Sequence, residues 1–600
     1  MKHVLCNIIS CEQTGFLKGR YIGENVRLVL DMIDYCNYSE EQAALIFLDF
    51  EKAFDSIAHS FIDNVLYHFN FGSSFRKWVN VLYSNASSCV INNGNYTNFF
   101  PVLRGVRQGC PLSPYLFILC TEIFCLHIKH SNNIKGITIK GKEVKISQFA
   151  DDTVLFIDGS YESVTNVQVA LSNFENISGL VINYDKSLLF PIGSLRENTF
   201  QLLQNSSFVT SNGPIKYLGI SFTHRKDDFF KLNYLPKLSR LKNVLNLWSM
   251  RDLTPIGKIT IIKSFALSQL VYLFTVLPNP PNYFMVELQR TLYNFIWSSK
   301  NHKVKHLSLI NDYEGGGLRM LHIESFINSL KCSWVRRYCS TDTSTWKIFF
   351  DLALRQYGGI FLFNCNMSPS DFSNMENVFI KNVCEAWFKY SFMSPTDHFD
   401  NQIFLNNSFI KIENNVFFSR EIVNANAYHV RNLFTITGVI KDFISYTEYN
   451  IRSLPFTVYH GLISALPLHW KHFIKNNGLE DITPNPNEIK IAVFKVNMSN
   501  SKNIYSSLRN NVAETPTCVY KWKRDFSDDL NFTRIFLLPF KALRNSKIQY
   551  FPFRFLHRIL GINSFLFRIG LTDSPRCSFC ADCEETLSHL FWDCSIINKF

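Results

Sequence analysis

Residues 43–55 read AALIFLDFEKAFD, and this stretch decides the fold. Its apolar run from Ala43 to Leu48 has the length and composition of a strand buried on both faces, and it places Asp49 at the carboxyl end. Taken alone, the pattern is better explained by a strand followed by an acidic helix N-cap. A second acidic stretch further along the chain changes that interpretation.

Residues 145–157 read KISQFADDTVLFI, in which alternating apolar residues flank a pair of acids. The pattern predicts a β-hairpin with Asp151 and Asp152 at or near its tip. Adjacent strand residues point to opposite faces, so only one of the two acids can aim straight at a shared site. In isolation, an ordinary acidic turn is the simpler explanation.

Together the two stretches predict a metal site. Carboxylates from separate strands can converge on hard divalent cations, because Mg²⁺ takes oxygen ligands and binds through one or two protein carboxylates. Two such ions about 4 Å apart assist in-line phosphoryl transfer, by activating the attacking oxygen and neutralising the leaving one. A polymerase that uses this chemistry needs Asp49 and Asp151 and little else.

Residues 104–117, which lie between these stretches, read RGVRQGCPLSPYLF. Glycine permits a close backbone approach, and Gln108 can both donate and accept hydrogen bonds. Pro111 and Pro114 predict a stiffened start to an apolar helix that runs through Ile128. A structural turn and helix would explain each residue separately, but not the whole string in this order.

The composition favours a globular intracellular protein. Of the 600 residues 46% are hydrophobic and 18% charged, and the net charge of +12 suits a polyanionic partner without requiring one. The run from Phe265 to Leu277 is too short to span a bilayer, and we expect no membrane partner. Scattered cysteines in apolar contexts are predicted to be buried free thiols: Cys120, Cys125, Cys332 and Cys384.

Two further regions carry a pattern. After Asp228, apolar residues recur at helical spacing to Trp248, and Thr254-Pro255 predicts the start of a second helix that continues to about Leu273. Near the C-terminus, the spacing Cys-x2-Cys-x8-His-x4-Cys suits a closed tetrahedral Zn²⁺ site: Cys577, Cys580, His589 and Cys594. Cys583 is a rival ligand, since Cys580-x2-Cys583 is spaced equally well. Unliganded cysteines are the alternative.

The ordered motifs resemble those of LINE-type (non-LTR) retrotransposon reverse transcriptases. The stretch at Asp49 is similar to motif A of that family, residues 104–117 to motif B, and Phe149-Ala150-Asp151-Asp152 to the FADD form of motif C. Three further blocks match in order: residues 13–20 (QTGFLKGR), 179–187 (GLVINYDKS) and 215–220 (IKYLGI). The resemblance covers residues 1–330 and 540–600 well, and the middle of the chain loosely.

This resemblance implies roles for individual residues. Asp49, Asp151 and the backbone carbonyl of Phe50 would bind two Mg²⁺ ions, with Asp152 in support. Phe54 would be the steric gate that selects deoxynucleotides, and Gln108 and Gly109 would line the nucleotide pocket. Lys186 is a candidate proton donor to the departing pyrophosphate, or alternatively a surface lysine that neutralises phosphate charge. The register Cys577, Cys580, His589 and Cys594 fits the family, and one structural Zn²⁺ is expected there.

The fold class implied is α+β, a right-hand polymerase with four regions. Residues 1–225 would be the palm with a remnant of the fingers, and 226–300 a helical thumb whose Lys258 and Lys263 grip the nucleic-acid backbone. Residues 301–540 would be a mostly helical connector, and 541–600 the CCHC zinc region. The partners implied are an RNA template, a DNA primer and deoxynucleoside triphosphates, in the nucleus and cytoplasm.

Two expectations concern what the chain lacks. The family encodes an endonuclease before the polymerase or after the CCHC segment, and we expect no nicking activity from this chain. Cationic fingers residues lie upstream of residues 13–20 in the family, so we expect weak or no polymerase activity from these 600 residues and activity from a full-length parent. The alternatives are an inactive truncated relic that retains nucleic-acid binding, and a group II intron-type or telomerase-like polymerase.

Overall fold

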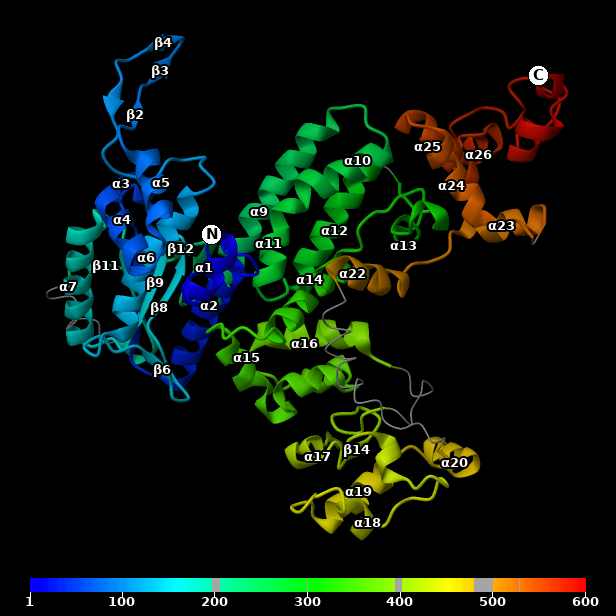
Figure 1. The fold of residues 1–600 in the computed structure, drawn as a ribbon. Helices are drawn as coiled ribbons and strands as arrows, with labels where there is room; N and C mark the ends of the chain where they lie inside the picture. The colour runs from blue at the N-terminus through cyan, green and yellow to red at the C-terminus, as the bar shows by residue number, and fades with distance from the viewer. Residues whose placement is uncertain (197–205, 299–300, 394–401, 480–499, 528, 600) are drawn as a thin grey trace.

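A five-stranded sheet lies at the centre of residues 1–222 (Figure 1). The structure is a computed structural model that describes residues 1–196, 206–298, 301–393, 402–479, 500–527 and 529–599. The strand order is β11-β10-β1-β9-β8. The bounds of these strands are β1 Ala43–Leu48, β8 Ile146–Phe149, β9 Asp152–Ile157, β10 Leu188–Ile192 and β11 Val209–Thr210.

β1 is the middle strand and is buried along its whole length. It runs antiparallel to both neighbours, with Leu45 opposite Phe190 of β10 and Phe156 of β9. Its side chains alternate between two cores. Ala43, Leu45 and Phe47 join one core, while the residues between them join the other. The predicted doubly buried strand is confirmed.

Helices cover both faces of this sheet. One face packs against α2 and the helices that follow residue 225, and the other packs against α4, α6 and α7. The predicted apolar helix after Pro111 is confirmed as α6, which begins at Ser113 with Pro114 in its first turn. The helices of this part are α1 Lys2–Ile8, α2 Ile22–Ser39, α3 Ala53–Ser56, α4 His59–His68, α5 Ser73–Tyr83, α6 Ser113–His130, α7 Tyr161–Ser178 and η1 Gly193–Arg196.

Short two-stranded ribbons surround the central sheet. The ribbon of β2 to β5 projects away from it (Figure 1), β6 pairs with β7 in a tight hairpin, and β12 pairs with β13. Their bounds are β2 Ser87–Ser88, β3 Ile91–Asn92, β4 Asn95–Tyr96, β5 Phe100–Pro101, β6 Ile137–Ile139, β7 Lys142–Val144, β12 Ile215–Tyr217 and β13 Ile220–Phe222.

Residues 226–297 are helical, as the periodicity predicts. The Thr254 side chain accepts a hydrogen bond from the backbone N–H of Gly257, which makes it the N-cap of the predicted second helix. That helix does not continue unbroken to Leu273, because a π-helical turn interrupts it. The bounds are α9 Lys226–Ser249, α10 Pro255–Ile261, η2 Ile262–Ala266 (the π turn), α11 Ser268–Val276 and α12 Asn282–Trp297.

The rest of the chain is mostly helical in its described residues. Residues 404–474 have a hydrophobic core of their own, and residues 518–536 form a small fourth core. The elements up to residue 477 are α13 His306–Leu309, η3 Tyr313–Gly315, α14 Ile323–Tyr338, α15 Lys347–Leu354, η4 Arg355–Tyr357, η5 Gly359–Asn364, η6 Pro369–Phe372, α16 Val378–Ser391, β14 Lys411–Ile412, β15 Asn415–Val416, α17 Arg420–Asn424, η8 Val430–Leu433, α18 Phe443–Thr447, α19 Phe456–Ala465 and α20 Leu468–Asn477. After residue 500 follow α22 Ser501–Asn510, α23 Thr517–Asp525, α24 Phe532–Ala542, α25 Ser546–Leu556, α26 Asn563–Arg568, η9 His589–Asp593 and η10 Ile597–Lys599.

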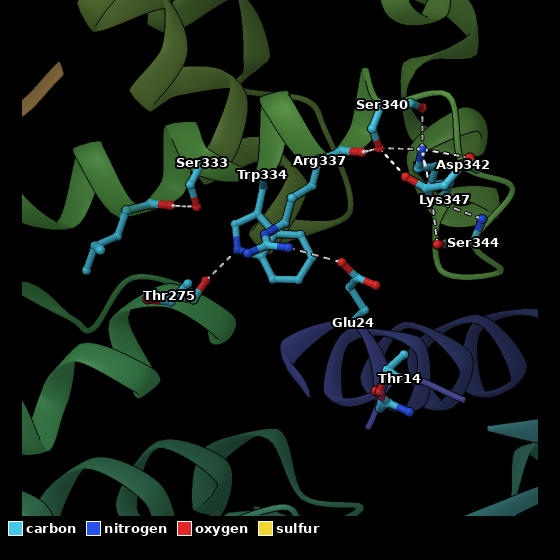
Figure 2. A network of polar contacts seen from close by, with 12 residues as sticks. Thr14, Glu24, Thr275, Ser333, Trp334, Arg337, Ser340, Asp342, Ser344 and Lys347 are labelled. Carbon is cyan, nitrogen blue, oxygen red and sulfur yellow. Dashed lines mark hydrogen bonds and ion pairs between the residues drawn. The ribbon is translucent and has the colours of Figure 1, made fainter. Parts of the chain in front are cut away.

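Helix α14 docks onto the first part of the chain through buried polar contacts (Figure 2). The indole N–H of Trp334 donates to the carbonyl of Thr275 at 2.8 Å, and Arg337 pairs with Glu24 of α2 at 3.2 Å. Burial raises the pKa of Glu24 to about 7 despite the opposing charge of Arg337. The pair Arg27–Asp31 of α2 is also buried, and Asn377 donates to Asp31 at 2.8 Å. These contacts fix α2 against α14 and α16.

Among the described helices, none alone has the length and apolar content of a membrane span, although the bent pair Pro255–Ala266 and Ser268–Val276 meets both criteria together. The four cysteines predicted to be buried free thiols are buried and free.

Candidate active site

Asp49 follows the C-terminal end of β1, and a loop from a distant part of the sequence holds its backbone there. The backbone N–H of Asp49 donates to the hydroxyl of Ser187 at 3.1 Å, and its carbonyl accepts from Asn183 N–H at 2.8 Å. Ser187 is fully buried. Residues 181–187 therefore fix the backbone at Asp49 from one side.

The same loop determines where the Phe50 carbonyl points. Phe50 forms an antiparallel bridge with Ile182, and the hydrogen bonds on either side of that bridge join Glu51 to Val181 and Asn183 to Asp49. In such a non-hydrogen-bonded pair, the backbone groups of the bridge residues point away from the partner. The Phe50 carbonyl thus faces away from residues 181–183.

The hairpin β8–β9 brings Asp151 and Asp152 to the same end of the sheet, and the predicted hairpin is confirmed. Phe149 pairs with Asp152 across the hairpin, and Ala150 takes a left-handed conformation with φ of 57° at the tip. In the register of β1 with β9, Leu48 pairs with Thr153. Asp49 and Asp152 are the next residues of these two strands, so the three carboxylates gather at one place.

The three carboxylates repel one another. Desolvation and the charge of Asp49 raise the pKa of Asp151, against a backbone hydrogen bond that lowers it. Desolvation, followed by the charges of Asp151 and Asp49, raises the pKa of Asp152 to about 6. No described lysine or arginine forms an ion pair with any of them. Oxygen donors that share an uncompensated negative charge fit a hard divalent cation.

Gln13 positions the hairpin tip, a role that the sequence did not reveal. Its side-chain amide donates to the Ala150 carbonyl at 3.2 Å, and its side-chain oxygen accepts from Ala150 N–H at 2.9 Å. Gln13 is fully buried, and a Cβ on Gly15 would lie 2.6 Å from the Ala150 nitrogen. Residues 13–15 therefore hold the turn that carries Asp151, although they lie 137 residues away from it in sequence.

We predict that Gln13→Leu weakens metal binding at this site by several-fold. The leucine would leave the buried N–H and carbonyl of Ala150 without their partner, at a cost of about 1–3 kcal/mol for each group. The turn would relax and Asp151 would lose its fixed position. Mn²⁺ titration followed by electron paramagnetic resonance measures this affinity.

Gln42→Leu is the matched control for this experiment. Gln42 donates one hydrogen bond of 3.1 Å to the Gly159 carbonyl at the other end of the same sheet. If Gln13→Leu binds Mn²⁺ as tightly as Gln42→Leu does, Gln13 contributes only to folding.

The residues predicted to bind the nucleotide lie around α3. The ring of Phe54 stacks on Phe117 with 4.3 Å between centroids, and Phe16 meets its edge at 6.2 Å. The Gln108 side chain donates to Asp55 at 3.4 Å, while Gly109 is exposed with φ of 82°. These positions stay predictions.

Gly105 attaches the loop of residues 104–110 to α3. Its φ is +87°, and a Cβ there would lie 2.7 Å from the backbone of Asp55. Its N–H donates to the carbonyl of Ile57 at 2.7 Å. Only glycine fits this approach. Lys186 is exposed on the loop that supports Asp49, and its role stays a prediction.

A second group of potential ligands converges near the C-terminus: Cys577, Cys580, His589 and Cys594, whose ligand atoms all lie within 4.8 Å of one another. The Sγ atoms of Cys577 and Cys594 are 3.9 Å apart. A tetrahedral site with Zn–S bonds of about 2.3 Å requires an S–S separation of about 3.8 Å. Cys583 is exposed and lies outside the group. The set brought together is the one predicted.

The thiols of this group differ in their tendency to ionise. Backbone hydrogen bonds from Cys583 and Asp582, helped by His589, lower the pKa of Cys580 to about 6. Burial raises the pKa of Cys577. The Cys580 sulfur lies 3.2 Å from the Nε2 atom of His589. A thiolate beside an imidazole nitrogen suits Zn²⁺, which prefers sulfur and nitrogen ligands.

Lys258 does not have the role expected of it. Its side chain is buried, and its Nζ donates to the Ser298 hydroxyl at 2.6 Å and lies 5.4 Å from the centroid of the Phe295 ring. It holds the C-terminal end of α12, where carbonyl groups attract cations. Lys258 therefore cannot grip a nucleic-acid backbone. Lys263 is half-buried, and its proposed contact remains a prediction.

Two families match the chain where these sites lie. Residues 1–222, which hold the acidic site, match reverse transcriptase (RNA-dependent DNA polymerase). Residues 500–600, which hold the Cys and His group, match the zinc-binding region in reverse transcriptase. Residues 1–222 are thus a reverse transcriptase domain, and residues 500–600 are a zinc-binding region of the kind found in reverse transcriptases. Homologous proteins include a transposon TX1 protein and Pol polyproteins from R2 retrotransposable elements, which are of the non-LTR kind.

Those homologues are longer proteins. A transposon TX1 149 kDa protein of Xenopus laevis is 29% identical over 357 residues, 57% of this chain and 26% of that one. The Pol polyprotein from the R2DM retrotransposable element of Drosophila melanogaster is 29% identical over 223 residues, 35% and 20% of the two chains. The chain spans about a fifth to a third of the length of the curated relatives it matches.

Among solved structures, telomerase from Candida albicans with a fragment of telomeric RNA aligns over 56% of this chain and 50% of that one, at 12% identity and a TM-score of 0.28.

Proposed function

We propose that this chain extends a DNA primer on an RNA template with deoxynucleoside triphosphates, by nucleotidyl transfer supported by two Mg²⁺ ions. The observation that carries the proposal is the convergence of Asp49, Asp151 and Asp152 from two neighbouring strands in a reverse transcriptase domain. Retrotransposon relatives that encode Pol proteins support the same activity.

The metal-binding residues would be Asp49, Asp151 and the carbonyl of Phe50, with Asp152 in support. Bound divalent cations supply Lewis-acid activation of the attacking 3′ oxygen and neutralise the charge of the leaving group. The chain's own contribution is positional. The loop of residues 181–187 fixes Asp49, and Gln13 fixes the turn at Asp151. Fixed donors cost no reorganisation during the reaction.

The resemblance to reverse transcriptases also supports a role for each region of the chain. We assign residues 1–225 to the palm with part of the fingers, 226–300 to the thumb, 301–540 to a connector and 541–600 to a CCHC region that holds one Zn²⁺. Gln108 and Gly109 would contact the incoming nucleotide, and Lys186 would donate a proton to pyrophosphate or neutralise its charge.

We predict that Phe54→Val admits ribonucleotides. The ring is held in place between Phe16 and Phe117, so it can exclude a ribose 2′-hydroxyl without moving away. Its removal should raise the ratio of ribonucleotide to deoxynucleotide incorporation by about tenfold or more, since relief of ~1.4 kcal/mol of steric repulsion corresponds to a factor of ten. Primer extension with each nucleotide type measures the ratio.

Phe69→Val is the control for Phe54→Val, because Phe69 is a half-buried phenylalanine of the same core. If the ratio of ribonucleotide to deoxynucleotide incorporation is unchanged in Phe54→Val, Phe54 serves only in packing.

The activity itself is tested by extension of a labelled DNA primer on an RNA template with the purified chain. The proposal requires template-directed products that depend on deoxynucleotides and on a divalent cation. Binding of the hybrid without any extension, over a range of Mg²⁺ and Mn²⁺ concentrations, would favour the relic alternative instead.

A further inference from the structure

A cationic hollow of about 300 Å³ lies between the hairpin β6–β7 and helices α15 and α17. Four cationic side chains line it, from segments far apart in sequence: Lys140, Lys142, Arg355 and Arg420. All four are exposed, and no ion pair joins any of them to a carboxylate among the described residues. The first part of the chain and the connector build this surface together.

The carboxylates that follow two of these cations in sequence have other partners. Glu143 pairs with Lys145 at 3.1 Å and accepts from Gly136 N–H at 2.7 Å. Glu421 accepts from the backbone N–H groups of Arg452 and Ser453 at 2.6 and 3.1 Å. These acids follow Lys142 and Arg420 directly in sequence, yet they bind other partners.

Among the described residues Asp351 is the only acid in the lining, and it too has a partner. Its carboxylate accepts a hydrogen bond of 2.7 Å from the Tyr338 hydroxyl. A lining with four positive charges and one negative charge retains an excess of positive charge. An anion in the hollow would offset the mutual repulsion of these like charges.

The two sides of the hollow are held in fixed relation. Lys140 has φ of 45° and Gly141 has φ of 81°, as in a tight two-residue hairpin turn. The opposite side belongs to α15, which packs on the helices docked to α2 through Arg337 and Glu24 (Figure 2). The backbone on either side, in the hairpin β6–β7 and in α15, is therefore held by regular secondary structure.

We propose that this hollow binds the sugar-phosphate backbone of a nucleic-acid strand, a role for the connector that rests on the proposed polymerase function. Arginine donates paired hydrogen bonds to phosphate oxygens, and lysine adds a mobile point charge. The apolar side chains of Ile348 and Leu352 line the same hollow and suit the sugar. Contacts of this kind carry affinity without sequence information.

The test compares two double variants with a control of equal charge. Lys140→Gln/Lys142→Gln changes the hairpin side and Arg355→Gln/Arg420→Gln the connector side, so each side is tested separately. Lys475→Gln/Lys502→Gln removes two exposed lysines of the connector that do not line the hollow. Fluorescence anisotropy with a labelled single-stranded RNA and a DNA of the same length gives the affinity of the full chain for each.

We expect each test variant to bind about tenfold more weakly at moderate salt. The slope of log affinity against log salt should fall by about 1.4, since each single-strand phosphate contact contributes roughly 0.7. In the wild-type chain, RNA or DNA should protect Lys140 and Lys142 from acetylation but leave Lys475 reactive. Loss of affinity for only one of the two strands identifies which nucleic acid the hollow takes.

Two negative outcomes differ in meaning. If the wild-type chain binds both strands and the test variants match the control, the hollow has no such role and the polymerase proposal stands. If the wild-type chain binds neither strand, both proposals fail.

Discussion

Asp49→Ala and Asp151→Ala should each abolish RNA-templated primer extension, with a loss of at least about two orders of magnitude. Each variant removes a carboxylate that would bind divalent cations at the meeting point of β1 and the hairpin β8–β9. The remaining oxygens would bind the cations too weakly to hold the 3′ oxygen and the triphosphate in line.

The fold should survive both substitutions. The raised pKa of Asp151 means that its ionised form is disfavoured in the folded protein, so at neutral pH this carboxylate lowers stability. Removing it relieves repulsion with Asp49 and Asp152. We therefore expect the thermal unfolding midpoint of Asp151→Ala to stay the same or rise, which separates loss of chemistry from loss of structure.

Metal binding gives a readout that does not depend on turnover. Mn²⁺ affinity should fall by about tenfold or more in both variants, and stay unchanged in Glu41→Ala, whose exposed carboxylate lies at the opposite end of β1. Wild-type Mn²⁺ affinity in either Asp variant, together with normal extension, would contradict the assignment of these residues as metal ligands.

The parts of the site that the sequence predicted are those encoded locally. The apolar run before Asp49 and the alternation around Asp151 each specify a strand within a few residues, and the strands then place the acids. The ligand spacing around Cys577 is likewise local. The four C-terminal ligands lie within 18 residues, so short loops suffice to bring them together.

The parts that the sequence did not predict depend on distant partners. Gln13 acts through Ala150, 137 residues away, and its own neighbourhood carries no sign of that contact. The resemblance implied that Lys258 grips nucleic acid, but the sequence could not show that α12 ends beside it with the Ile296 carbonyl and the Ser298 hydroxyl. The π turn at Ile262–Ala266 occurs without glycine or proline, so no local signal announced it.

The second large effect concerns zinc. We expect one Zn²⁺ per chain, lost in Cys577→Ser and in Cys594→Ser, because a structural site with three ligands binds far more weakly than one with four. Structural zinc sites in small peptides contribute about 10–16 kcal/mol of apparent binding free energy at neutral pH, and in such sites metal binding drives folding.

The segment packs on the rest of the C-terminal region through aromatic rings. Phe591 meets Phe555 at 4.7 Å between centroids, and Trp592 lies 5.6 Å from Phe526. Both Phe591 and Trp592 belong to the π-helical turn that begins at the ligand His589. Trp592 is already exposed on one side, so removal of zinc should release this turn and separate the Trp592 ring from Phe526.

Metal analysis of protein purified under reducing conditions measures the zinc, and limited proteolysis with tryptophan fluorescence measures the release. Chelation should make residues beyond about 570 sensitive to protease while residues 1–222 stay protected, since their core does not include the CCHC group. Cys583→Ser is the matched control, as its thiol is exposed and outside the group. Full zinc content in Cys577→Ser with loss in Cys583→Ser would move the ligand set to Cys583, and absence of zinc from the wild-type chain would rule the site out.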